Sequence, residues 1–163
     1  MKRISLDKSF SLDDVLNIYN SDIDTFVNLQ IGYDNNIYIL LNEGDENTGV
    51  YKVIKLQINW FEQKLICHEL LELGEHNLAA CFVQPIRNNI LLVDSRCEYK
   101  AAIGPTKNAV VIDYKGTRLN ELCLGDGIEN CLVDSNGNIY IQAILMKAFM
   151  VTTVGTILLV AVV

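Results

Sequence analysis

Three short segments of the chain share one pattern, in which a polar turn is followed by apolar residues at every second position. Side chains spaced by two lie on one face of a β-strand, so each segment predicts the turn and the second strand of a hairpin. A short apolar strand precedes each turn and begins at Phe26, Ala79 or Cys131. The three segments read YDNNIYIL (33–40), IRNNILLV (86–93) and DSNGNIYI (134–141).

The hairpins recur at a nearly constant interval. Aligned on the Asn before the Ile, they fall at Asn36, Asn89 and Asn138, which gives steps of 53 (89 − 36) and 49 (138 − 89) residues. A period of roughly 40 to 50 residues is typical of a four-stranded propeller blade. The sequence therefore predicts an all-β protein of antiparallel four-stranded propeller-type blades, about two complete plus the start of a third. The third and fourth strands are expected at 50–58 and 64–73 in the first unit and at 108–116 and 118–125 in the second.

The turn residues support hairpins. Asn136-Gly137 is predicted to take positive φ at both central positions of a tight turn, and Asn35-Asn36 and Asn88-Asn89 are weaker versions of it. Lys115-Gly116 predicts a further hairpin turn. The fourth strands are expected to end at Gly74 and Gly125.

The segment GIENCLVDSNGNIYI (127–141) resembles the repeat of NHL-type and gluconolactonase-like β-propellers. In those families a strand carrying Val-Asp runs into a D-x-x-G-N-[IL]-[YW]-[IV] hairpin, which matches Asp134 to Ile141 here. The resemblance implies a propeller that usually closes with six or more blades, so a chain of about two blades is expected to be a truncated product. It implies either a binding platform or, as an alternative, a metal-dependent enzyme whose acidic residues converge at a central channel.

Three segments divide the chain: 1–25, the propeller-type repeats of 26–141 and an apolar tail of 142–163. In the first, Ser11 is a candidate N-cap, and the stretch to Asn20 predicts a short helix or, as the alternative, the outer strand of a preceding blade. Acidic residues in the first turn and a stripe of apolar residues favour the helix; they are Asp13, Asp14, Leu12, Val15, Leu16 and Tyr19.

The apolar tail admits three interpretations. Ala148 to Val163 carries no charge, as in a membrane anchor, but a spanning helix needs about 20 apolar residues. Alternatively, AFMVTTV (148–154) and TILLVAVV (156–163) form two buried strands around Gly155. The third interpretation, which we favour, is a frame shift after Ile141.

A shift of one base is testable on the codons. It turns the pair Met146-Lys147 into Glu and Met150-Val151 into Gly, and one permitted product is the polar sequence GYFDEGVYGNYGWNNPIG. Propellers of the resembling type often continue with a segment such as GYFDEG. A last blade left unpaired would expose a sheet edge and favour self-association.

Composition limits the partners and the compartment. The 163 residues suit one domain, and a net charge of −7 with a pI of about 4.7 argues against nucleic-acid binding. No secretory signal is recognisable, so the cytoplasm is the expected location. The expected partner is another protein or a small molecule, and membrane contact through Ala148 to Val163 is the less favoured alternative.

No catalytic, cofactor or metal site is predicted. Asp134 to Asn138 has the oxygen spacing of a calcium loop, but Ile144 stands where an EF-hand needs Glu, so a hairpin turn is expected. The acidic stretch of 43–49 is expected to be a solvated connection. His68 and His76 are expected to be structural.

Two further groups of side chains are assigned to packing. Trp60-Phe61 is expected to pack on a neighbouring blade rather than to form a contact patch. The five cysteines contain no C-x-x-C pair and are expected to be small buried hydrophobes in a reducing compartment; they are Cys67, Cys81, Cys97, Cys123 and Cys131. The predicted function is thus a binding or interaction scaffold rather than an enzyme, with the gluconolactonase-like fragment and a small tail-anchored membrane protein as alternatives.

Overall fold

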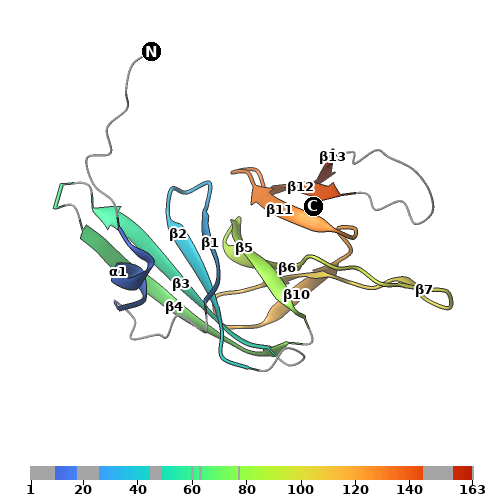
Figure 1. The fold of residues 1–163 in the computed structure, drawn as a ribbon, viewed down its shortest axis with the longest axis horizontal. Coiled ribbons are helices and arrows are strands. Elements are labelled where there is room, and N and C mark those ends of the chain that lie inside the picture. The colour runs from blue at the N-terminus through green and yellow to red at the C-terminus, as the bar shows by residue number, and fades with distance from the viewer. Residues whose placement is uncertain are drawn as a thin grey trace, which may run out of the picture.

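The computed structural model describes residues 10–17, 26–44, 49–59, 61–62, 64–76, 78–144 and 156–162. These residues form one short helix and antiparallel β-sheets, which confirms the prediction of an all-β chain (Figure 1). The first sheet has four strands whose spatial order follows the chain order. They are β1 (Phe26–Ile31), β2 (Ile37–Asn42), β3 (Gly49–Asn59) and β4 (Lys64–His76).

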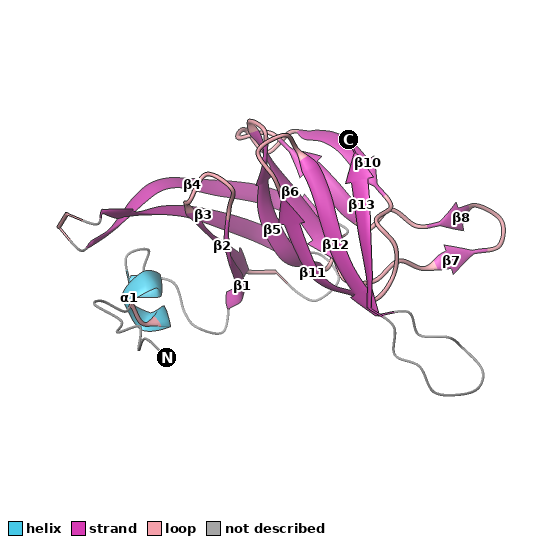
Figure 2. Ribbon diagram, turned by 90° about the horizontal axis from the view of Figure 1, so that it is seen from above, coloured by secondary structure: helices cyan, strands magenta, loops and turns pink. Residues whose placement is uncertain are grey.

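The second sheet repeats this arrangement with one insertion. Its four strands again lie in chain order, and a two-stranded hairpin, β7 (Tyr99–Lys100) with β8 (Gly104–Pro105), interrupts the chain between the second and the third. This hairpin projects from the end of the molecule opposite the helix (Figure 2). The four strands are β5 (Ala80–Ile86), β6 (Asn89–Asp94), β9 (Ala109–Ile112) and β10 (Arg118–Leu122).

A third sheet follows, with β11 (Ile128–Val133), β12 (Asn138–Ile144) and β13 (Thr156–Val162) in that order. The strand predicted at TILLVAVV is therefore present and pairs antiparallel with β12, from Asn138 opposite Val162 to Ile144 opposite Thr156. The predicted partner strand at 148–154 lies outside the described residues. Within the residues that the structure describes, no helix has the length and apolar character needed to cross a membrane.

The sheets are layered, and the second strands of the first two sheets, β2 and β6, are buried on both faces, whereas β12 alternates buried and partly exposed residues. Ile39 faces the helix α1 (Leu12–Asn17), whereas Leu40 faces the second sheet. In β6, Leu92 faces the first sheet and Leu91 the third, and in β12 Ile141 again faces the preceding sheet. The aligned residues Ile39, Leu92 and Ile141 thus all point towards the preceding layer.

The helix α1 takes the place of a layer in front of the first sheet. Ser11 caps it as predicted, since the Asp14 amide donates to Ser11 Oγ at 3.1 Å and the Ser11 amide to Asp14 Oδ2 at 2.8 Å. Val15 and Leu16 are buried against the apolar face that contains Ile39. The predicted helical stretch from 18 to 20 lies outside the described residues.

The first strands of the three sheets lie side by side, β1 beside β5 and β5 beside β11. One side chain bonds to the other two strands: Gln30 Oε1 accepts from the Val83 amide at 3.1 Å, and Gln30 Nε2 donates to the Cys131 carbonyl at 3.0 Å. Gln84 has the matching place in the second sheet, because it lies opposite Leu91 as Gln30 lies opposite Tyr38. Gln84 is buried, and neither amide atom has a hydrogen-bond partner among the described residues.

The predicted turn type is wrong at the third hairpin. The Asp134 amide donates to the Asn138 carbonyl at 3.1 Å, and the Gly137 amide to the Asp134 carbonyl at 3.0 Å. The loop thus has three residues, and a type I turn followed by one left-handed residue closes it. Of Asn136 and Gly137, only Gly137 has positive φ, at 85°. Asn35 (φ 61°) holds the same place in the first hairpin, and the β9–β10 turn at Lys115-Gly116 follows the same plan.

Two other boundaries differ from expectation. The β4 strand continues through Gly74 to His76, because its pairing with β3 extends to the pairs Val50–Glu75 and Gly49–His76. By contrast, β10 ends at Leu122 and Gly125 lies beyond it with φ of 97°. Gly74 therefore does not end a strand.

Candidate functional site

A pocket of about 570 Å³ opens beside the turns of the first two sheets. The β1–β2 turn, the β5–β6 turn and the β9–β10 turn all contribute side chains to it. Lys55 of β3 completes the wall. The lining residues are Tyr33, Asp34, Tyr38, Lys55, Pro85, Arg87, Asn88 and Tyr114.

Direct contacts hold these turns together. Tyr33 Oη donates to the Arg87 carbonyl at 2.8 Å, which joins the first hairpin to the second. Gly32 allows a close approach, because a methyl group there would lie 2.5 Å from Pro85 Cγ. On the other side, a methyl group at Gly137 would lie 2.9 Å from Arg87 Nε. The Arg87 side chain therefore lies against the third hairpin while its backbone is bonded to the first.

Asp34 is the acidic group of the pocket and accepts hydrogen bonds from its own hairpin. Its carboxylate accepts from the Asn36 amide at 3.2 Å, from Asn36 Nδ2 at 2.6 Å and from Tyr38 Oη at 2.8 Å. Burial raises the pKa of Asp34, but the hydrogen bonds from Asn36 and Tyr38 and the charge of Lys55 outweigh burial, so the pKa is lowered. The group is ionised at neutral pH.

Lys55 lies between this carboxylate and an aromatic ring. Its Nζ is 3.5 Å from Asp34 Oδ2 and 5.7 Å from the centre of the Tyr38 ring. Burial raises the pKa of Tyr38, and its hydrogen bond to Asp34 raises it further. Burial and the charge of Asp34 likewise raise the pKa of Tyr33. Both phenols are therefore protonated at neutral pH, and each already donates its one proton, Tyr38 to Asp34 and Tyr33 to the Arg87 carbonyl.

This arrangement suits binding better than acid–base catalysis. An acid–base catalyst needs a group that titrates near the working pH, and the pKa values of Asp34, Tyr33 and Tyr38 all move away from neutrality. The pocket instead combines two cationic side chains, Lys55 and the exposed Arg87, with aromatic rings. Such a combination binds anionic or planar polar groups.

The segment from Asp134 to Asn138, which has the oxygen spacing of a calcium loop, is a hairpin turn, as expected. Asp134 accepts hydrogen bonds from the Asn136 and Asn138 amides, both at 2.9 Å, and from Asn138 Nδ2 and Tyr140 Oη at 2.9 and 3.1 Å. These donors lower the pKa of Asp134, those of Asn138 most. Among the residues that the structure describes, no three His, Cys, Asp or Glu side chains gather to hold a metal ion.

The prediction that Phe61 packs on a neighbouring blade is wrong. The Phe61 side chain is 97% exposed at the β3–β4 turn, and Trp60 lies outside the described residues. In the 43–49 connection, Glu43 pairs with Lys52 at 2.8 Å. His68 and His76 both fall in β4, and their side chains are outside the described part.

The cysteines are less buried than predicted. Only Cys131 is fully buried among the four described, and burial raises its pKa to about 12. Cys81, Cys97 and Cys123 are partly exposed because they lie on an edge strand or in connections. Cys97 and Cys123 lie close together, which their spacing in the sequence does not reveal.

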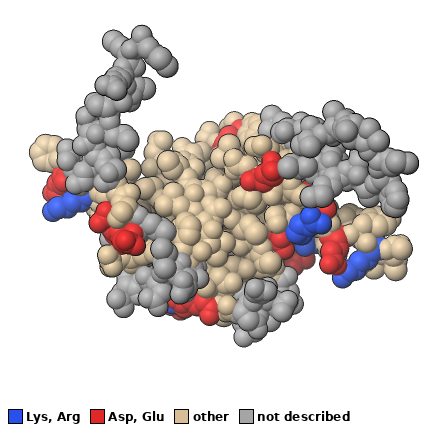
Figure 3. Space-filling view, in the orientation of Figure 1, with Lys and Arg blue, Asp and Glu red and all other residues tan. Residues whose placement is uncertain are grey.

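Sequence reasoning also missed the pocket. Tyr33, Asp34 and Tyr38 belong to a segment whose pattern predicts only a hairpin, and Arg87 stands beside the Asn-Asn pair of the second turn. The repeat itself is the signal that could have joined them, since equivalent turns of stacked sheets lie at the same end. Figure 3 shows Lys and Arg at scattered positions near the ends of the visible face rather than gathered in one patch.

Comparisons of the chain with protein families, with curated proteins and with solved structures gave no match. The fold and the pocket geometry therefore carry the functional argument.

Proposed function

We propose that this chain is a binding scaffold of propeller-type blades, with a carboxylate-binding pocket at the hairpin turns. Three features support the blades: each four-stranded sheet follows chain order, aligned residues face the preceding layer, and the first strands lie side by side. Up-and-down sheets stacked in this way are the units of a propeller. The resemblance of Asp134 to Ile141 to NHL-type repeats agrees with this proposal.

The observation that carries the function is the position of Arg87. It is exposed at the pocket and has φ of 53°, a conformation that residues other than glycine rarely adopt. Asn35, the other such residue in the described chain, lies in the adjacent turn. Positive φ at these two residues closes the tight turns that border the pocket.

The charges indicate the class of ligand. Lys55 is paired with Asp34, and Arg87 lines the same pocket as three tyrosines. A guanidinium can bind a carboxylate through two parallel hydrogen bonds. The ligand is thus an acidic group, carried by a small molecule or by a segment of a partner protein.

The test follows backbone amide shifts by NMR while the full chain is titrated with benzoate or, separately, with a short glutamate peptide. Shifts are expected at residues 33–38, 55, 87–88 and 114, and a stronger response to one probe identifies the source of the acidic group. Arg87→Gly keeps the turn but removes the guanidinium, and we expect about tenfold weaker binding for the loss of one charge-assisted bond.

Arg118→Ala is the matched control, because Arg118 lines a different pocket, near the β7–β8 hairpin. Its binding is expected to equal that of the unmodified chain. Benzamidine, a cation of similar size to benzoate, should give no shifts. Shifts spread over both pockets, or unchanged affinity in Arg87→Gly, would defeat the proposal.

The frame shift after Ile141 stays a prediction. The nucleotide sequence across the Gln142 codon checks it, because a propeller continuation in another frame supports the shift. An intact frame without such a continuation would contradict it.

A further inference from the structure

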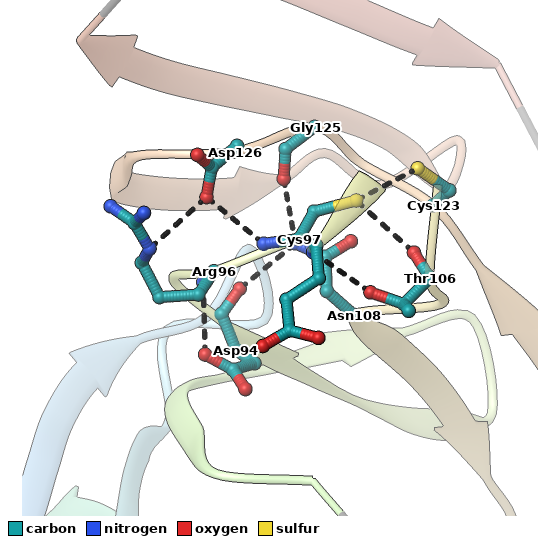
Figure 4. Close-up of polar contacts among 9 residues, drawn as sticks. Asp94, Arg96, Cys97, Thr106, Asn108, Cys123, Gly125 and Asp126 are labelled. Atoms are coloured by element: carbon teal, nitrogen blue, oxygen red, sulfur yellow. Dashed lines mark hydrogen bonds and ion pairs between the residues drawn. The ribbon is translucent and has the colours of Figure 1, made fainter. Parts of the chain in front are cut away.

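Cys97 and Cys123 lie far from the turn pocket, and their sulfur atoms are 3.5 Å apart. Cys97 stands in the loop before β7, and Cys123 follows the last residue of β10 (Figure 4). Both side chains are partly exposed, so a small reagent can reach them. We propose that these two residues are a redox-modification site, at which a small-molecule disulfide such as oxidised glutathione converts the thiol pair into an intramolecular disulfide.

Contacts that do not involve sulfur hold the two segments together. The Cys97 amide donates to Asp126 Oδ1 at 3.0 Å, and Arg96 Nε pairs with the same oxygen at 3.2 Å. The Ile128 amide donates to the Ser95 carbonyl at 2.9 Å. The loop at 95–97 is therefore fixed against the connection at 123–128 before any covalent bond forms.

Asn108 fixes the same two segments from below the thiol pair. Its Nδ2 donates to the Asp94 carbonyl at 3.1 Å and to the Gly125 carbonyl at 2.7 Å, while its Oδ1 accepts from the Leu124 amide at 2.9 Å (Figure 4). The side chain is 1% exposed. A buried amide with three good hydrogen bonds allows little movement, so the sulfurs stay within reach of each other.

The reduced state is also stabilised. Cys97 Sγ donates to the Thr106 carbonyl at 3.1 Å. Burial raises the pKa of the Cys97 thiol, and the hydrogen bond and charge of Cys123 raise it further. Cys97 is thus a thiol at neutral pH, and formation of a disulfide requires an oxidant.

The reaction balances as two thiol–disulfide exchanges. One cysteine thiolate attacks a sulfur of oxidised glutathione, which forms a mixed disulfide and releases one glutathione thiolate. The second cysteine then attacks the protein sulfur of the mixed disulfide and releases the second glutathione. Two protein thiols are oxidised, one glutathione disulfide is reduced, and the two protons pass to the glutathione thiolates.

The experiment equilibrates the full native chain in glutathione buffers of increasing oxidised fraction, quenches it with acid and alkylates the remaining thiols. Cleavage after Lys, Arg and Glu separates all five cysteines, with Cys97 and Cys123 on Cys97–Glu98 and Leu122–Glu129. Mass spectrometry should find these two peptides linked. We expect this disulfide at oxidised fractions at least about tenfold lower than those that modify Cys81, since proximity favours ring closure over mixed disulfides.

Variants supply the matched comparison. In Cys97→Ser or Cys123→Ser the remaining thiol can only form a mixed disulfide, whereas Cys81→Ser should leave the linked peptides unchanged. The oxidised native chain should also melt at a higher temperature than the reduced chain, because the disulfide lowers the conformational entropy of the unfolded chain. Glutathione adducts on both thiols without a linked peptide, or links between molecules, would overturn the proposal, and the measurement on the unmodified chain needs no variant to fold.

Discussion

The first and second sheets share one strand order but are fastened to their neighbours by different side chains. In the first, Tyr51 near the start of β3 fixes the connection to the next sheet: its hydroxyl donates to the Leu78 carbonyl at 2.7 Å and accepts from the Ala80 amide at 2.8 Å. In the second, Asn108 just before β9 does the same with the Gly125 carbonyl and the Leu124 amide. Two unlike residues, Tyr51 and Asn108, thus make the same kind of contact in the two sheets.

The two sheets also differ at their first strands and in their length. Gln30 is bonded to both neighbouring strands, whereas its counterpart Gln84 is buried without a partner in the described chain. The strands β3 and β4 have 11 and 13 residues, against 4 and 5 for β9 and β10. The shared layer packing therefore defines the unit, and the polar contacts and strand lengths vary around it.

The largest effect is expected in the apolar layer between the sheets, where Leu40 and Leu92 belong to one cluster and are both 0% exposed. Leu40→Ala and Leu92→Ala should each lower the free energy of unfolding by about 2 to 5 kcal/mol, since each leaves a cavity. Urea unfolding measures this loss. Leu119→Ala, at a half-exposed position, is the control and should have little effect. A large difference between the two core variants would mean that the sheets are not equivalent layers.

The next effect concerns the two residues that fix the connections between sheets. Asn108→Ala should lower the free energy of unfolding by about 3 kcal/mol and Tyr51→Phe by about 2 kcal/mol, because each leaves buried backbone groups unpaired. Tyr99→Phe, at a side chain 76% exposed, is the control. If Tyr51→Phe proves neutral in thermal and urea unfolding, the proposed equivalence with Asn108 fails.

A smaller effect separates the two glutamines. Gln30→Leu removes two hydrogen bonds and should lower the free energy of unfolding by about 2 kcal/mol, whereas Gln84→Leu should be neutral or stabilising by up to about 1 kcal/mol. Each variant is the control for the other, because the substitution and the sheet position are the same. Equal destabilisation by both would show that Gln84 has a partner outside the described residues.

The smallest effect is a difference in pH dependence. The pKa of Asp34 is lowered, so its contribution to stability is present above the ordinary value of 3.8 and is lost as the pH falls through the folded value. Burial raises the pKa of Asp94 despite hydrogen bonds from Arg96 and Ala79, so its contribution is present below 3.8 and is lost as the pH rises.

Asp34→Asn should therefore reduce the loss of unfolding free energy that occurs as the pH falls below about 4. Asp94→Asn should remove the loss of unfolding free energy that occurs as the pH rises above about 4. Urea midpoints between about pH 3 and pH 7 measure both slopes. The same change of slope in both variants would be incompatible with the opposite pKa shifts.

The sequence predicted the repeated hairpins because they depend on local patterns. Alternating apolar residues and turn-forming Asn and Gly identify strands and reversals without knowledge of the tertiary structure. The β7–β8 hairpin was missed because its strands have only two residues each. The three-residue turn at Gly137 was missed because Asn-Gly also suits a two-residue turn.

The pocket and the thiol pair could not be predicted in the same way. Tyr33 and Arg87 are 54 positions apart, and Cys97 and Cys123 are 26 apart. Their proximity depends on how the sheets stack and on where the inserted loop returns, which a single sequence does not encode in any short window. Phe61 illustrates the opposite error, since aromatic character alone suggested burial.

The helix α1 has a consequence for how the protein opens. It has six residues, too few to be stable alone, yet it covers the apolar face formed by β2 and β3. Detachment of such an element needs far less free energy than global unfolding, so amides under it exchange with solvent before those between the sheets. The outer face of the first sheet can consequently expose apolar surface to other molecules without global unfolding.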